Sequence, residues 1–174
     1  RGSGRRAFNP IIKQFTGFTP REQRTVVENE LSRLRFDYFE TVPKSLKGDG
    51  PATNQMRGEM GRFMETDVFS YVNSDDYKNI DNDVLKRRNL KIVVNFYRAK
   101  ARDHAINPDY AVTNRDFIDR QTNRYMDFSS SKRKEINEIY KDITQSERDI
   151  FKDGEMMMLP YLEELLNEQS PKLN

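Results

Sequence analysis

The chain of 174 residues contains no cysteine, no tryptophan and a single histidine. Without cysteine it has no disulfide, no thiolate nucleophile and no thiolate metal site. Only Asp103 and Asp109 lie near His104 in the sequence, so a metal site built from histidine and carboxylates is not predicted. We instead expect His104 to interact with the C-terminal end of a helix dipole. The sequence predicts no cofactor.

Long hydrophobic runs are also lacking. No apolar segment approaches the roughly 20 residues that span a bilayer, and no secretory signal peptide is recognised. The phosphate-binding pattern G-x-x-x-x-G-K-[ST], the dinucleotide pattern G-x-G-x-x-G and the nucleophile pattern G-x-S-x-G are absent. We therefore expect no membrane span, no export by a signal peptide and none of these common catalytic motifs.

Acidic residues are plentiful, but their pattern does not single out a catalytic pair. Glycosidases and muramidases need two carboxylates on either side of a cleft. Glu59, Glu65 and Asp67 lie close together on one predicted helix, but neighbours of this kind arise freely among 28 acidic residues. The acidic residues between 75 and 83 are better explained as groups that cap helices. We therefore expect that the chain is not an enzyme. The alternative is that it is a domain associated with a peptidoglycan hydrolase.

The charges that are present nearly cancel but are unevenly distributed. Hydrophobic residues make up 35% of the chain and charged residues 33%, so we expect a thin core and long exposed helix faces. The net charge is +2. Residues 1–24 are strongly basic, whereas the segment from Gln145 to the end is acidic. This layout indicates either electrostatic complementarity within or between chains or simply solvated helix faces.

The longest helical pattern covers residues 80–105 and predicts a central helix. Asp81 or Asn82 can cap its start, and Asn107-Pro108 stops it because proline lacks the N–H group. Its predicted apolar face repeats at helical spacing. That face consists of Val84, Leu85, Ile92, Val93, Val94, Phe96 and Ala99.

The other faces of this helix are basic, and we call these seven residues the basic set: Lys86, Arg87, Arg88, Lys91, Arg98, Lys100 and Arg102. The basic set is the candidate surface for an anionic partner. It could neutralise several phosphates and give salt-sensitive, non-specific DNA binding, with Asn89, Asn95 and Tyr97 adding hydrogen bonds. A protein partner, the chain's own acidic C-terminal segment and plain solvent exposure stay open as alternatives. A second basic cluster, Lys132-Arg133-Lys134, opens a later helix and also hints at an anionic partner.

The remaining pattern predicts an all-α fold, an irregular bundle of about seven or eight helices around the central basic amphipathic helix. One domain, or a fragment of a larger chain, would contain three parts. Residues 1–24 form a basic arm with a short docking helix between Asn9-Pro10 and Gly17. Residues 25–106 form a helical core, and residues 107–174 form a C-terminal helical subregion with an acidic tail.

Capping patterns predict where the other helices begin. Thr25 with Glu28 and Thr144 with Glu147 read as capping boxes, whereas Lys44–Ala52 reads as a loop. Further starts are predicted at Thr53 or Asn54, at Thr113 or Asn114, and at Ser131. A final helix over Met156–Glu168 tolerates Pro160 only in its first turn, and Ser170–Asn174 reads as a frayed end.

One of these helices carries Met56, Met60 and Met64 together with Gly58 and Gly61. Methionine is flexible enough to line an adaptable binding groove, and it also fills ordinary cores. The glycines weaken the helix by about 1 kcal/mol each unless another element packs closely against them. Core is the favoured interpretation of this face.

Two stretches resemble segments near the C-termini of very large phage proteins that are carried inside virions and ejected with the DNA or form internal cores. They are NPIIKQFTGF…RE…VVENELSRL, from Asn9 to Leu34, and SDDYKNIDNDVLKRRNLKIVVNFYRAKAR, from Ser74 to Arg102. The resemblance extends to the helix Ser131–Ile143 but carries no catalytic residues. It implies a structural or ejection-related helical module that associates with other virion proteins or with itself. Its expected location is the virion interior or the host cytoplasm.

Overall fold

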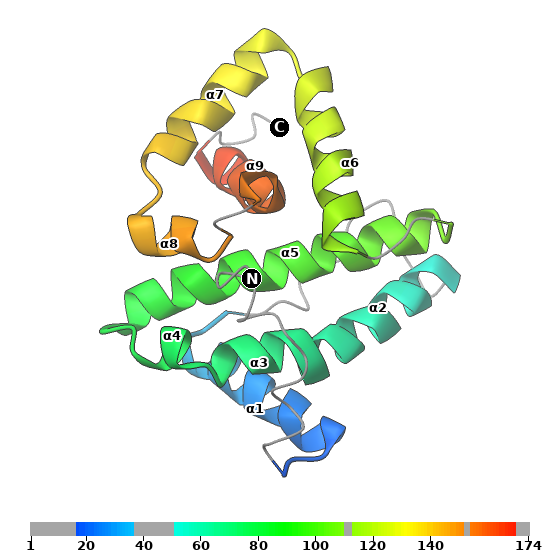
Figure 1. Cartoon of the computed structure of the whole chain (residues 1–174), viewed down its shortest axis with the longest axis vertical. Coiled ribbons are helices and arrows are strands. Elements are labelled where there is room, and N and C mark those ends of the chain that lie inside the picture. Colours follow the sequence, from blue (N-terminus) through cyan, green and yellow to red (C-terminus); the bar gives the residue numbers. More distant parts are fainter. Residues whose placement is uncertain (1–16, 37–50, 110–112, 152–153, 170–174) are drawn as a thin grey trace.

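Helix α5 (Asp83–Ile106) runs through the middle of the molecule, and the other helices pack on two sides of it (Figure 1). The computed structural model describes residues 17–36, 51–109, 113–151 and 154–169. Throughout these ranges the chain is helix or connecting turn, and they contain no strand. The predicted all-α, irregular bundle around a central basic helix is confirmed.

The start and end of α5 follow from its sequence. Asn82 is the N-cap, because its Oδ1 accepts a hydrogen bond from the backbone N–H of Leu85 at 2.9 Å. The helix ends one residue before Asn107-Pro108. The prediction that Val84 belongs to the apolar face is wrong. Val84 is 70% exposed, because it lies in the first turn, beyond the layers that cover the middle of the helix.

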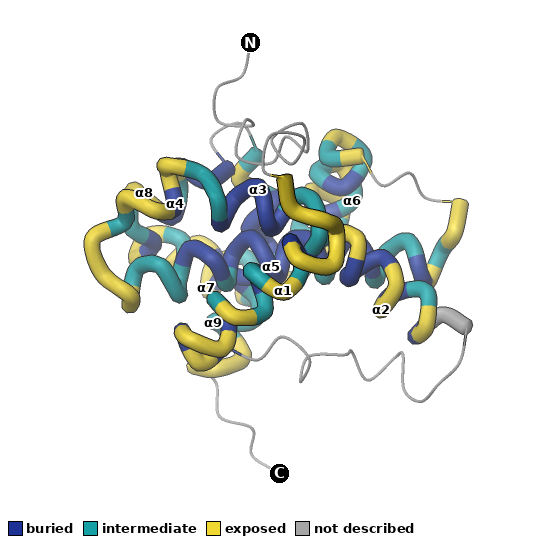
Figure 2. Tube along the Cα trace, turned by 90° about the horizontal axis from the view of Figure 1, so that it is seen from below, coloured by how far each residue is buried: buried dark blue, intermediate teal, exposed yellow. Residues whose placement is uncertain are grey.

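The middle of α5 is buried on every side. Leu90 and all residues from Ile92 to Tyr97 are buried, including Asn95. A helix is buried all round when packing elements cover its opposite faces. In Figure 2 the buried colour gathers along α5 and α3, and exposed residues lie on the outer turns of the molecule. Asn89, Asn95 and Tyr97 therefore point into the protein instead of towards a solvent-side partner.

One layer comes from the N-terminal half of the chain. It consists of α1 (Pro20–Arg33), α2 (Pro51–Phe63), the π-helical segment η5 (Met64–Val68), α3 (Phe69–Val72) and α4 (Asp75–Lys78). Helix α2 packs along α5, and η5 packs on α1. The helix predicted to begin at Thr53 or Asn54 is a continuous run from Pro51 to Val72, so Pro51 and Ala52 are helical instead of forming the end of a loop.

Helix α1 begins earlier than predicted, and the capping box expected at Thr25 is wrong. Thr19 is the N-cap, and its side chain and that of Glu22 each bond the backbone N–H of the other residue, at 3.2 and 2.8 Å. Pro20 decides this start, since its fixed φ angle and missing N–H suit the first helical position. Thr25 lies inside the helix and donates its hydroxyl to the Arg21 carbonyl at 3.0 Å. Helix α1 thus runs across residues 24 and 25, where the sequence pattern placed a boundary.

The methionine face of α2 and η5 belongs to the core. Met56, Met60 and Met64 are all buried. A Cβ atom on Gly61 would lie 2.8 Å from the guanidinium of Arg24 in α1, so the end of that side chain fills the space over this glycine. Gly58 has no such neighbour. The expected close packing therefore applies to one glycine of the two.

The other layer comes from the C-terminal half. It consists of α6 (Asn114–Asp127), α7 (Ser130–Lys141), α8 (Gln145–Asp149), the 3₁₀ segment η6 (Glu155–Met158) and α9 (Leu159–Gln169). Helices α6 and α7 form two sides of an arch, and α9 lies between them and packs on both α7 and α5 (Figure 1). Figure 1 therefore shows α5 as the one element between the two halves of the chain.

Most predicted starts in this layer are correct. Thr113 caps α6, and Thr144 with Glu147 forms the predicted capping box of α8. Pro160 falls in the first turn of α9, as it must. The cap of α7 is Ser129 instead of Ser131, because Ser129 is the extended residue whose hydroxyl accepts from the Lys132 N–H at 3.1 Å. The predicted final helix is divided into η6 and α9.

Aromatic side chains on α5 join the two layers into one core. The Phe96 ring lies 5.0 Å from that of Phe117 in α6 and 5.1 Å from that of Phe151, both in the C-terminal half. The Tyr97 ring lies 4.8 Å from that of Phe63 in α2. Such pairs stabilise a core by about 0.5–1.5 kcal/mol each beyond the area they bury.

Three predictions concern residues outside the described ranges. They are the short helix opened by Asn9-Pro10, the part of the Lys44–Ala52 loop before residue 51, and the frayed end over Ser170–Asn174.

We predict that Thr19→Ala lowers the free energy of unfolding by about 1 kcal/mol, because an N-cap hydroxyl is lost. The matched change Thr25→Ala should be neutral or slightly stabilising, since alanine favours an exposed helix interior more than threonine does. Urea unfolding monitored by circular dichroism measures both. Equal losses in the two variants would contradict the observed start of α1.

Candidate functional site

The seven residues of the basic set do not form one surface. Side chains on a helix point in directions about 100° apart from one residue to the next, so seven positions over 17 residues face several neighbours. Lys86 and Arg87 face the N-terminal layer, Arg88, Lys91 and Arg98 pair with the C-terminal layer, and Lys100 is buried among aromatic rings. Arg102 lines a pocket.

Lys86 and Arg87 hold the N-terminal layer. The Arg87 Nε donates to the carbonyl of Leu34 at 3.1 Å, and its guanidinium lies 5.7 Å from the ring centroid of Phe36. The Lys86 Nζ lies 5.5 Å from the ring centroid of Tyr77. Leu34 ends α1, so Arg87 places a positive charge on a carbonyl at the negative end of that helix.

Arg88, Lys91 and Arg98 form ion pairs with glutamates of the C-terminal layer. Arg88 contacts Glu147 at 2.8 Å. Lys91 contacts Glu164 at 2.9 Å and Glu168 at 3.2 Å, and Arg98 contacts Glu164 at 3.3 Å. All three glutamates belong to the acidic segment that begins at Gln145. Among the alternatives that the sequence left open, this segment is the partner that these three residues contact.

Glu147 is the most deeply buried member of these pairs. Its residue is 0% exposed, and its carboxylate accepts from the backbone N–H and hydroxyl of Thr144, at 2.9 and 2.8 Å, and from the Tyr161 hydroxyl at 3.3 Å. Burial, followed by the nearby Glu147 charge, raises the pKa of Tyr161 to about 12. A buried carboxylate needs partners of this kind, and Arg88 supplies the opposite charge. Glu147 therefore links α5, α8 and α9.

Lys100 is a buried lysine in an aromatic box. It is 6% exposed, and its Nζ lies between 5.2 and 5.4 Å from the ring centroids of Phe63, Phe96 and Tyr97. It donates to the Asn114 Oδ1 at 3.0 Å. Desolvation lowers the pKa of Lys100 to about 8, although the nearby Asp67 acts in the opposite direction. Lys100 thus joins α2, α5 and α6 and is not part of an exposed basic face.

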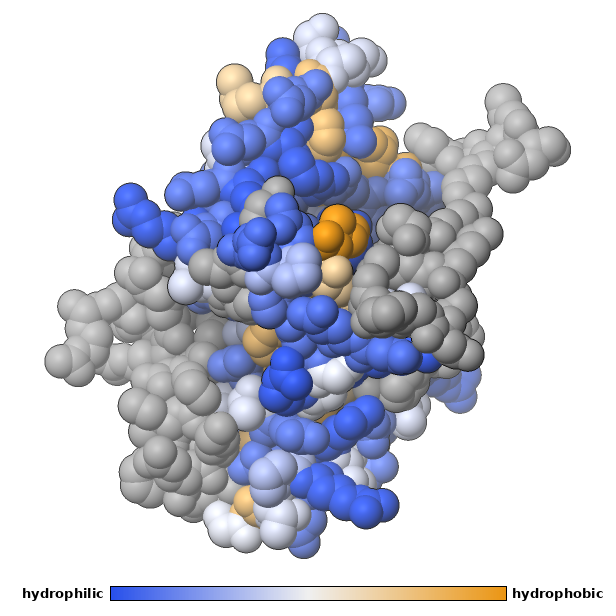
Figure 3. Space-filling model, turned by 90° about the vertical axis from the view of Figure 1, so that its right-hand side faces the viewer, coloured by the Kyte–Doolittle hydropathy of each residue, from blue (hydrophilic) through white to orange (hydrophobic). Residues whose placement is uncertain are grey.

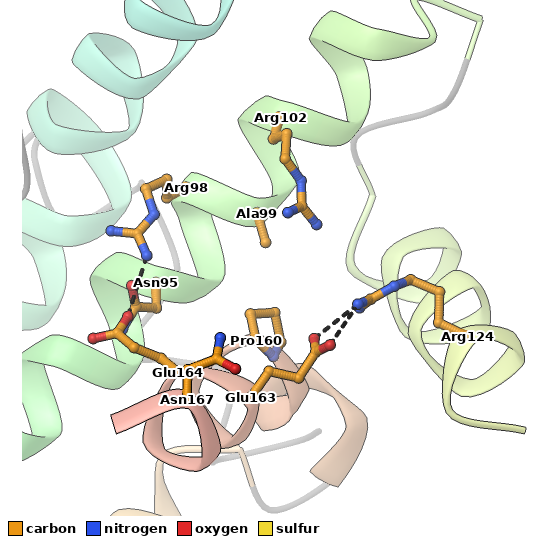
Figure 4. A pocket seen from close by; sticks show the side chains of 9 residues that line it. All are labelled: Asn95, Arg98, Ala99, Arg102, Arg124, Pro160, Glu163, Glu164 and Asn167. Atoms are coloured by element: carbon orange, nitrogen blue, oxygen red, sulfur yellow. Dashed lines mark hydrogen bonds and ion pairs between the residues drawn. The ribbon is translucent and has the colours of Figure 1, made fainter. Parts of the chain in front are cut away.

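A pocket of about 270 Å³ lies between α5, α6 and α9, and Arg102 lines it (Figure 4). Arg124 donates two hydrogen bonds of 2.8 Å to the carboxylate of Glu163 on one side. Arg98 binds Glu164 on the other side. Arg102 projects from α5 towards the space between these pairs and makes no hydrogen bond or ion pair with any described residue.

A second pocket of about 320 Å³ lies between α5, α7 and α9. Arg88, Lys91 and Glu168, which are already joined in ion pairs, contribute its polar lining. Ile139 and Leu165 contribute apolar lining. Lys91 binds Glu168 within this pocket and Arg88 binds Glu147 beside it, so these three groups are already paired, unlike Arg102 in the first pocket.

His104 and Glu59 form a contact that the sequence did not predict. The Nδ1 of His104 contacts a carboxylate oxygen of Glu59, and its Nε2 lies 3.1 Å from the Pro108 carbonyl oxygen. Glu59 is buried and also accepts from the Gln55 side chain at 3.2 Å. His104 does lie in the last turn of α5, as expected for a helix-dipole partner. The contact joins α2 to the end of α5, and 45 residues of sequence separation conceal it.

The basic cluster at the start of α7 is also used within the chain. Lys132 lies 3.5 Å from Glu163, and its Nζ stands 3.9 Å from the ring centroid of Phe128. Arg133 donates to the carbonyls of Met126 and Phe128 at the end of α6. These positive charges therefore stabilise the C-terminal end of one helix even though they open another.

Several of the acidic residues considered as catalytic candidates lie at the starts of helices. The expectation that these acids cap helices is wrong: Ser74 and Asn82 are the caps, and Asp75, Asp76 and Asp83 lie in the first turns that follow. Asp83 also binds Arg33 at 2.8 Å. Within the described ranges no group of three histidine, cysteine or acidic residues is placed to hold a metal ion. None of the helices in those ranges is both long and apolar enough to span a membrane.

We predict that the free energy of unfolding rises with pH from about 7.5 to 9.5, by up to about 2 kcal/mol. The folded pKa of Lys100 lies below its unfolded value of 10.5, so the fold favours the neutral amine, and the penalty for its charge fades as pH rises above about 8. Lys100→Met should abolish this rise, whereas Lys134→Met, at an exposed position of α7, should keep it. Urea unfolding across this pH range measures the effect, and a rise that survives in Lys100→Met would contradict it.

The chain was compared with protein-family models, curated proteins and solved structures, and none of them matched. The candidate site is therefore defined by the geometry of this chain alone.

Proposed function

We propose that this chain is a structural assembly module, a helical part of a larger phage virion protein that docks onto other virion proteins near the DNA. The observation that carries this proposal is that several cations of α5 are paired or buried within the chain. Arg88, Lys91 and Arg98 bind glutamates of the same chain, and Lys100 is buried. Charged groups that pair within the chain stabilise its fold, which favours a structural role. The resemblance to phage internal virion proteins suggests the virion as its location.

The surface supports docking through polar contacts. Figure 3 shows one face of the molecule, which is largely hydrophilic with small, separated hydrophobic areas. The exposed large hydrophobic side chains among the described residues lie on separate turns: Phe18, Val84, Ile106 and Met126. Single apolar residues of this kind are normal on a soluble surface, and transient interfaces are about as apolar as the rest of the surface.

Non-specific DNA binding receives less support as an alternative. A DNA-binding helix presents unpaired cations to phosphates. Arg88, Lys91 and Arg98 already pair with Glu147, Glu164 and Glu168, so a phosphate would compete with these carboxylates.

A hydrolase also receives less support. A glycosidase needs one carboxyl group that can donate a proton and a second one across a cleft. Glu163 and Glu164 line the first pocket, but Arg124 and Arg98 bind them. Glu59, the buried acid of α2, is occupied by His104 and Gln55.

Size-exclusion chromatography with light scattering tests the proposal. The chain is measured alone and after mixing with proteins extracted from virions of the phage that carries its gene. We expect its mass to rise from that of the free chain to that of a discrete complex with one virion component. A chain that keeps its free mass with every virion fraction would overturn the proposal.

The same chromatography with a short DNA duplex tests the DNA-binding alternative. Co-elution with DNA at about 50 mM salt that is lost at about 200 mM, without binding to any virion protein, would favour the DNA-binding function. Lys134→Glu, which changes an exposed cation outside the basic set, serves as the control for general charge effects.

A further inference from the structure

The pocket between α5, α6 and α9 has more positive charge than its own carboxylates balance. Five cations line the pocket or bind its glutamates, and only three carboxylates are available to pair with them. The cations are Lys91, Arg98, Arg102, Arg124 and Lys132; the carboxylates are Glu163, Glu164 and Glu168. All three carboxylates are already engaged, which leaves Arg102 without a partner among the described residues.

Buried hydrogen-bonding groups beside this pocket are also unsatisfied. Asn95 lines the pocket and is 1% exposed, yet neither polar atom of its amide has a partner. One terminal nitrogen of Arg98 is buried and unpaired as well. Native proteins leave few such groups unpaired, and an ion or a ligand is one of the usual reasons. The unmet groups here are mainly donors, which calls for acceptor atoms.

The electrostatics of Arg98 agree with this picture. Desolvation is the largest cause that lowers the pKa of Arg98, and the charge of Arg102 lowers it further. Glu164 acts in the opposite direction, but Lys91 shares that carboxylate. Two guanidinium groups one helical turn apart therefore repel each other across a pocket whose acids are already used. An added anion would relieve this repulsion.

We propose that this pocket binds a small oxyanion, a phosphate or carboxylate group on a compact ligand, with Arg102 as its principal contact. Guanidinium groups match both kinds of oxyanion, because their N–H donors are arranged as a planar fork. A volume of about 270 Å³ limits the ligand to a small molecule. This inference goes beyond the assembly role and does not depend on it.

Isothermal titration of the folded chain tests the site with three probes: inorganic phosphate, succinate and, as the control for ionic strength, sodium chloride. We expect phosphate or succinate to bind with a dissociation constant of about 1 mM or tighter and chloride to have no comparable effect. Preference for phosphate would identify a phosphorylated ligand, and preference for succinate a carboxylate ligand. No binding of either oxyanion, or equal heats with chloride, would overturn the proposal.

Arg102→Met tests the principal contact. Arg102 makes no ion pair within the described part of the chain, so we expect this variant to fold like the parent and to bind at least about tenfold more weakly. Arg115→Met changes an exposed arginine of α6 that does not line the pocket and should bind like the parent. Equal weakening in both variants, or in neither, would overturn the role of Arg102.

Asn95→Leu gives a second readout that separates a ligand site from an ordinary buried amide. The leucine removes the unsatisfied polar atoms at similar volume, so the free energy of unfolding without anion should hold or rise. Anion binding should weaken at the same time. Unchanged binding in this variant would show that Asn95 does not contact the anion. Arg102 would then be the only contact, and one contact does not account for the expected dissociation constant. This result would therefore contradict the proposed site.

Discussion

The compensation of charge on α5 is the constraint on which the rest of the structure depends. The helix is buried all round at its middle, yet its sequence carries seven cations. A charge that loses water on folding must find a partner or give up its charge. Glu147 and Glu164 supply partners from the C-terminal layer, and aromatic rings with Asn114 surround Lys100. Docking of the acidic segment that begins at Gln145 onto the basic helix is therefore a requirement of the fold.

This requirement also explains the arrangement of the two layers. The N-terminal layer supplies apolar contacts to α5 through α2, whose Phe63 ring packs on the Tyr97 ring of α5. The C-terminal layer supplies apolar contacts through Phe117 and Phe151 and, in addition, the glutamates. Two pockets remain beside these glutamates: one where Arg88 and Lys91 are already paired, and one around Arg102, which has no partner among the described residues.

The sequence predicted the all-α fold, the central helix to within three residues at each end and several caps, because these depend on local chemistry. Asn82, Thr113 and Thr144 each cap a helix through a bond to the residue three positions further along the chain. Local chemistry also explains the failure at Thr25. The same threonine and glutamate spacing occurs at Thr19, and the helix-start preference of Pro20 selects between them.

The candidate site was predicted only in part, because composition and spacing give charges but not their directions. The cations of α5 were evident, and the acidic segment was one of several partners left open. Which glutamate meets which cation depends on the packing of α8 and α9, far along the chain. The contact of His104 with Glu59 and the fork of Arg124 on Glu163 have no sequence signal of their own. The unpaired state of Arg102 follows only once every glutamate is placed.

A double-mutant cycle between Arg88 and Glu147 tests the central claim most directly. Arg88→Met, Glu147→Gln and the double variant are unfolded in urea, and the exposed pair Lys141–Glu138 in α7 gives the matched control cycle. We predict that Arg88→Met alone costs about 2–4 kcal/mol, since it leaves a fully buried carboxylate without its cation. The coupling should reach at least about 1.5 kcal/mol, against at most about 0.5 kcal/mol for the control pair. A coupling for Arg88 and Glu147 no larger than that of the surface pair would contradict the account.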